Sequence, residues 1–139
     1  MSDLKYSEVD MNKSEGIVCR GVAGATLPAN NSRSEVQQAV RELVLALVQA
    51  NGVEVEDLAA GFVTAGADVN TADAVQAIRH IAPRFDYFPL TGATDASGPP
   101  RLVRVLLLWN TAPAPREIKH IYLRGTESRR WAGVAEVAG

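Results

Sequence analysis

The sequence has little of what several specialised protein classes need. Cys19 is its only cysteine, which excludes an intramolecular disulfide and cysteine-rich zinc sites. No apolar run reaches the roughly 18 residues of a membrane-spanning helix, and residues 1–15 lack the apolar core of a signal peptide. The formal net charge is only −2, so nothing favours nucleic acid or an anionic membrane as a partner. We therefore expect a soluble, cytoplasmic protein.

The motifs of several enzyme classes are missing as well. There is no glycine-rich phosphate-binding loop, no nucleophile elbow and no paired-carboxylate signature. His80 and His120 lie far apart in the sequence and lack the spacing of metal ligands, so we interpret both as structural.

The length of 139 residues predicts a single domain. A domain of this size can bury about two thirds of its unfolded surface and needs no crosslinks. The composition, 47% apolar and 22% charged, is that of an ordinary globular protein. Residues 1–15 have few apolar side chains and are predicted to form a disordered leader. Residues 16–124 are predicted to form the domain, and residues 125–139 a tail.

Two segments carry the pattern of helices. Ser32 and Glu35 have capping-box spacing, and Gly52 suits a helix end. Between them, apolar residues recur at helical intervals: Val36, Val40, Leu43, Val44 and Leu47. A second helix is expected to begin at Asn70 or Thr71 and to end before Pro83.

Five segments are predicted to be strands: residues 16–24, a short stretch around 62–65, and residues 85–91, 101–109 and 118–123. Pro89 favours either a position at the edge of the sheet or the end of this strand. Residues 101–109 (RLVRVLLLW) are apolar on both faces, which predicts a central strand covered on both sides. The alternation of strands with two helices indicates an α/β or α+β fold.

Arg104 is the most informative residue, because it lies in the most hydrophobic segment of the chain. A guanidinium there stays charged and needs an anionic partner or several acceptors. One interpretation is a structural ion pair with a core carboxylate. The other is a cation in a pocket wall that binds a ligand carboxylate or a developing oxyanion.

Three other candidates have simpler explanations. Arg79, near the end of the second helix, is typical of a solvated residue that favours the helix dipole. Tyr122 lies between apolar neighbours and suits a half-buried aromatic position. Asp95, in the glycine- and proline-rich segment 92–100, is typical of a turn. These motifs alone indicate a soluble α/β domain with a buried arginine.

The order of several short segments, however, resembles the AroH class of chorismate mutases. Residues 20–26 (RGVAGAT) are similar to that family's opening strand, R-G-x-R-G-A-T, and residues 118–123 (IKHIYL) to its I-R-H-V-Y-L. The resemblance also includes the long helix and the segments Glu56–Leu58, Thr64–Asp68, Ala77–Arg79, Tyr87–Thr91 and Arg104–Val105. It extends over about residues 17–123.

This resemblance implies a mixed sheet with two main helices, in a trimer with a pseudo-barrel core and active sites between subunits. The implied reaction is the Claisen rearrangement of chorismate to prephenate. It needs no nucleophile, metal or cofactor, because the enzyme holds a dicarboxylate in a compact conformation and stabilises charge on the breaking ether oxygen.

Four residues match the family's site. The resemblance implies that Arg104 is the essential arginine facing the ether oxygen and a carboxylate. Tyr122 is the counterpart of a tyrosine that contacts the side-chain carboxylate, and Arg79 of an arginine on the rim. Asp95 stands where the family has a glutamate that bonds the ring hydroxyl, and is one methylene shorter.

Four other positions depart from the family. Ala23 replaces an arginine that binds a substrate carboxylate, and Gly92 replaces a cysteine in weaker contact. Asp73 replaces a pocket phenylalanine, and Gln76 a rim lysine. At these positions two cations are lost and one anion is gained. For a dianionic substrate, the loss of one buried, charge-assisted hydrogen bond weakens binding by an amount on the order of several kcal/mol.

Two functions are consistent with this mixture. The first is a chorismate-mutase-family enzyme that acts on chorismate or a related, less charged cyclic carboxylate, as in secondary metabolism. The second is a non-catalytic carboxylate-binding or interaction protein that keeps the trimeric fold.

Overall fold

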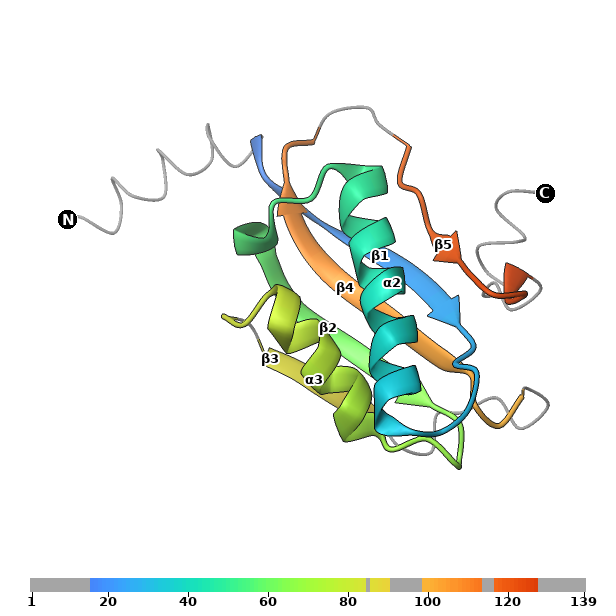
Figure 1. Cartoon of the computed structure of the whole chain (residues 1–139). Coiled ribbons are helices and arrows are strands. Elements are labelled where there is room, and N and C mark those ends of the chain that lie inside the picture. The colour runs from blue at the N-terminus through green and yellow to red at the C-terminus, as the bar shows by residue number, and fades with distance from the viewer. Residues whose placement is uncertain (1–15, 85, 91–98, 114–116, 128–139) are drawn as a thin grey trace.

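Two long helices pack on one face of a five-stranded sheet in the computed structural model, which describes residues 16–84, 86–90, 99–113 and 117–127 (Figure 1). The helices are α2 (Arg33–Asn51) and α3 (Thr71–Ile81). The strands are β1 (Val18–Thr26), β2 (Leu58–Ala65), β3 (Asp86–Leu90), β4 (Val103–Thr111) and β5 (Ile121–Tyr122), and a short 3-10 helix, η2 (Val55–Asp57), precedes β2. The expected α/β fold with a mixed sheet and two main helices is confirmed.

Helix α2 begins and ends at the residues that the sequence indicates. The Ser32 hydroxyl accepts a hydrogen bond from the Glu35 amide (3.3 Å), and Gly52 closes the helix in the left-handed conformation with φ 66°. The apolar residues of its buried face are Val36, Ala39, Val40, Leu43, Val44 and Leu47. None of the helices in the described part of the chain combines the length and apolar character needed to cross a bilayer.

Helix α3 has the predicted cap and the predicted end. The Asn70 side chain accepts a hydrogen bond from the Ala72 amide (3.0 Å). Proline has no amide hydrogen to continue the helix, which ends at Ile81, two residues before Pro83. Ala74, Val75, Ala77 and Ile78 are buried, and α3 packs against α2, β2 and β3.

The strand order is β3-β2-β4-β1-β5. β4 is antiparallel to both β1 and β2, whereas the outer pairs, β1 with β5 and β2 with β3, are parallel. The central position of β4 and the edge position of β3 were both expected. The fifth strand is shorter than predicted, because only Ile121 and Tyr122 join the ladder and residues 118–120 are held by side chains instead.

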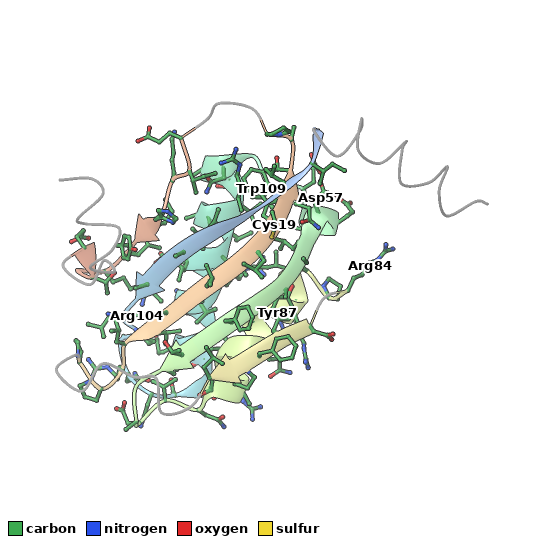
Figure 2. The ribbon with its side chains drawn as sticks, turned by 180° about the vertical axis from the view of Figure 1, so that it is seen from behind. Cys19, Asp57, Arg84, Tyr87, Arg104 and Trp109 are labelled. Carbon is green, nitrogen blue, oxygen red and sulfur yellow. The ribbon has the colours of Figure 1, made fainter. Side chains whose placement is uncertain are left out.

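The prediction that the central strand is covered on both faces is wrong for the single chain. Val103, Val105, Leu107 and Trp109 are buried under the helices, whereas Arg104, Leu106 and Leu108 point to the opposite face and are half-buried. Figure 2 views this opposite face, and no described helix covers it. Hydrophobicity records the tendency of a side chain to leave water, not which surface will cover it. We call this face the open face.

Asn51, the last residue of α2, fastens the segment before β5 to the core. Its side chain donates to the main-chain oxygens of Leu47 and Lys119, both at 2.9 Å, and accepts from the Lys119 amide at 2.8 Å. Asn51 is only 5% exposed. These bonds satisfy main-chain groups that a longer strand would have paired within the sheet.

We predict that Asn51→Ala lowers the free energy of unfolding by about 2 kcal/mol, since the part-buried main-chain N–H and C=O of Lys119 lose their bonds to the Asn51 side chain. Urea denaturation monitored by circular dichroism measures this change. Gln49→Ala is the matched control, because Gln49 is an exposed residue of the same helix. Equal stability of the two variants would contradict the assigned role of Asn51.

Candidate active site

Arg104 lies on the open face at one end of the sheet, far from Cys19 and Trp109 at the other end (Figure 2). β4 places it between Thr64 of β2 and Ala25 of β1, its partners in the two ladders. It lines a hollow of about 270 Å³ together with Phe62, Thr64, Leu90, Val105 and Leu106. These five companions are neutral and mostly apolar, so an anion beside Arg104 would be poorly screened and strongly attracted.

Two further candidates lie on the same face as Arg104. Tyr122 of β5 pairs with Ala25, which in turn pairs with Arg104 on the other side of β1. Ala23 pairs with Leu106 and therefore also faces the open side. The sheet thus brings Arg104, Tyr122 and Ala23 together, although Ala23 contributes no polar side chain.

His120 connects β1 to the segment that leads into β5. Its Nδ1 accepts a hydrogen bond from the Ala23 amide at 3.0 Å, which supports the structural interpretation of this histidine. His80 is exposed near the end of α3. No group of three residues able to hold a metal ion occurs among the described residues.

Arg79 does not line the hollow that contains Arg104. It is exposed on α3 and lines a groove of about 600 Å³ with Gln76, Tyr87 and Pro89. The rest of the lining is Asn70, which caps α3, and the α3 residues Thr71, Ala72 and Val75. We call this the α3 groove. It lies on the helix-covered side of the sheet, whereas Arg104 faces the open side. One chain therefore does not bring Arg79 and Arg104 together.

Asp73 is directed towards α2. Its Oδ1 lies 3.3 Å from Nε of Arg33, and its side chain is only 11% exposed. It is not among the residues that line the α3 groove. The carboxylate that replaces an apolar residue of the family is therefore compensated by a cation within the same chain.

Gly92 and Asp95 lie outside the described residues, so their places in the site stay predictions. Two other features were missed by the sequence interpretation. Phe62 and Thr64 line the hollow because they pair with Leu106 and Arg104, and their alternation along the strand is a signal that could have identified them.

Tyr87 is the second missed feature. It is 4% exposed, and its hydroxyl donates to the main-chain oxygen of Ala82 at 2.6 Å. Tyr87 also lines the α3 groove. Burial raises the pKa of Tyr87, and the nearby Arg79 guanidinium opposes this increase in part.

Comparisons with known proteins identify relatives of this chain. The family described as chorismate mutase type I matches residues 19–131. The chorismate mutase AroH of Thermus thermophilus is 37% identical over 109 residues, which cover 76% of this chain and 88% of that protein. The solved structure of a chorismate mutase from Clostridium thermocellum superimposes with a TM-score of 0.67 over 78% of this chain and 98% of that one. The latter is 20% identical and supports the fold alone.

We predict that Tyr87→Phe lowers the free energy of unfolding by about 1 kcal/mol at neutral pH, because it removes the bond to Ala82. Because the pKa of Tyr87 is higher in the folded chain than in the unfolded one, the folded chain binds the proton more tightly. This contribution is complete below the unfolded pKa of about 10 and is lost as the pH rises through the folded pKa.

Urea denaturation at several pH values between 8 and about 11 measures this effect. The difference between the wild type and Tyr87→Phe should stay constant up to about pH 10 and then decrease. A difference that grows above that pH would contradict the assigned burial effect.

Proposed function

This chain belongs to the chorismate mutase type I family, and we propose that it catalyses the cofactor-free rearrangement of chorismate or of a closely related cyclic carboxylate. The observation that carries this proposal is the position of Arg104 in an apolar hollow on the sheet. The pathway that follows, including a role in aromatic or secondary metabolism, and the cytoplasmic location stay predictions.

The proposed rearrangement forms no covalent bond between the ligand and the protein. One carbon–oxygen bond of an ether breaks while one carbon–carbon bond forms within the same molecule, and electron density accumulates on the ether oxygen in the transition state. A fixed guanidinium beside that oxygen stabilises the charge without transferring a proton. Because the described residues that line the hollow beside Arg104 are neutral and mostly apolar, a charge on the ether oxygen is weakly screened there.

The remaining site residues orient the ligand. The Tyr122 hydroxyl, on the face that Arg104 shares, is suited to donate to a ligand carboxylate. Asp95 is proposed to bond a ring hydroxyl, and Gly92 to take the place of a cysteine that makes a weaker contact with the ligand. Ala23 leaves room where a second cation would have bound a carboxylate.

We further propose that the active sites form between subunits of a homotrimer. A ligand that contacts both Arg104 and Arg79 needs two chains, because the sheet separates these residues within one. The open face supports this assembly: Phe88 and Leu90 are 47% and 40% exposed, and the neighbouring Leu106 and Leu108 are half-buried. Apolar side chains gathered on one face are typical of a subunit interface.

The alternative is a non-catalytic protein that binds a small carboxylate on the same fold. The neutral side chain of Ala23 favours it, since a dianion would lose one charged contact there. Activity assays separate the two functions.

We predict that the purified protein accelerates the loss of chorismate, followed by its ultraviolet absorbance. Arg104→Ala should lower kcat/KM by about 10²–10³-fold, the usual effect of removing one charge-stabilising donor. Arg84→Ala is the matched control, because Arg84 is exposed and lines neither the hollow beside Arg104 nor the α3 groove. Chorismate loss no faster than the uncatalysed background would exclude the parent reaction.

The variant Ala23→Arg, which adds a cation to the open face, distinguishes a mutase from a non-catalytic carboxylate-binding protein. An increase in kcat/KM shows that the lost cation limits an otherwise intact mutase. If activity stays at background in this variant, the non-catalytic alternative is favoured.

We predict a mass of about 45 kDa by light scattering, three times the chain mass of 14.9 kDa. Mixed refolding of Arg104→Ala with Arg79→Ala should recover part of the activity, because some shared sites then receive both arginines. A monomer, or mixtures no more active than either variant alone, would contradict sites that are shared between subunits.

A further inference from the structure

Two glutamines connect α2 to the wall of the α3 groove. Nε2 of Gln37 donates to the main-chain oxygen of Asp73 at 3.3 Å and to Oε1 of Gln76 at 3.0 Å. A main-chain carbonyl can only accept, so the Gln37 atom that reaches it must be the amide nitrogen. The Gln76 atom bonded to the same nitrogen must therefore be its oxygen.

This arrangement determines which part of Gln76 is available to a ligand. Its oxygen is used within the protein, which leaves the NH₂ group as the free end of a side chain that lines the α3 groove. An amide NH₂ group donates hydrogen bonds but carries no charge. It is suited to a hydroxyl, ether or carbonyl oxygen.

The charge of this wall is therefore small and positive. Arg79 contributes one guanidinium to the groove. The neighbouring Asp73 carboxylate does not neutralise it, because that carboxylate pairs with Arg33 at 3.3 Å and lies outside the lining. The wall thus offers one cation, Arg79, and a neutral donor at Gln76 in the place of a second cation.

We propose that Gln76, held in place by Gln37, determines the specificity of the site. Its NH₂ group selects a ligand that presents a neutral acceptor at this position, whereas a ligand with a second carboxylate there would require a cation. Gln37 is a positioning residue that acts through Gln76. This inference rests on the proposed function and narrows its substrate class to cyclic carboxylates of lower charge than a dianion.

The test compares the dianion chorismate with its two monomethyl esters, which are monoanions, by calorimetry and by turnover. Gln76→Lys should raise the ratio of the affinity for chorismate to the affinity for the better-bound ester about fivefold, because one exposed ion pair is gained with the dianion. Gln37→Leu should raise KM for that ester about threefold with kcat unchanged, since one neutral hydrogen bond is misplaced. Gln38→Leu, an exposed neighbour on α2, is the matched control.

The orientation of Gln76 has a test that needs no ligand. In nitrogen–proton NMR spectra of the free protein, Gln37→Leu should shift the side-chain NH₂ signals of Gln76, and Gln38→Leu should leave them in place. Unshifted signals in Gln37→Leu would overturn the positioning role.

The failures of the two proposals are distinguishable. A wild type that converts chorismate but prefers the dianion as strongly as Gln76→Lys overturns the specificity inference alone. A wild type that neither binds nor converts any of the three compounds overturns the proposed function and, with it, this substrate class.

Discussion

The alternation of side chains along β4 is the constraint on which the structure depends. Because β4 is paired on both sides, its odd-numbered residues are directed into the helix-covered core and its even-numbered ones onto the open face. The same register that buries Leu107 and Trp109 presents Arg104 to the hollow. A shift of one residue would exchange the two faces and place a guanidinium in the core.

At both edges of the sheet, side-chain contacts supplement the main-chain hydrogen bonds between strands. β5 has only two residues, and Asn51 and His120 hold the segment before it through main-chain bonds. These contacts position Tyr122 on the face of Arg104. At the other edge, the stacked rings of Phe62 and Phe88, 5.6 Å apart, extend the apolar surface across β2 and β3. The proposed trimer interface and the part of the proposed site that contains Arg104 therefore share the open face.

The two walls of the proposed site, the hollow beside Arg104 and the α3 groove, differ in the surroundings of their charged groups. The hollow places one guanidinium among described residues that are neutral and mostly apolar, where an anionic oxygen is strongly stabilised. The α3 groove is more open to solvent, and polar contacts to α2 occupy Asp73 and the oxygen of Gln76. Both walls carry fewer cations than the family pattern implies, which is why a less charged ligand is proposed.

The sequence alone determined the local structure, because capping residues, apolar periodicity and proline act within a few residues of themselves. The bounds of α2 and α3, the central position of β4 and the importance of Arg104 were predictable on this basis, and the order of short motifs indicated the family. Only the tertiary structure decided that one face of β4 is open, that Asp73 pairs with Arg33 and that Gln37 orients Gln76. Each of these depends on which residues, distant in the chain, the packing of α2, α3 and the sheet brings within a few ångströms.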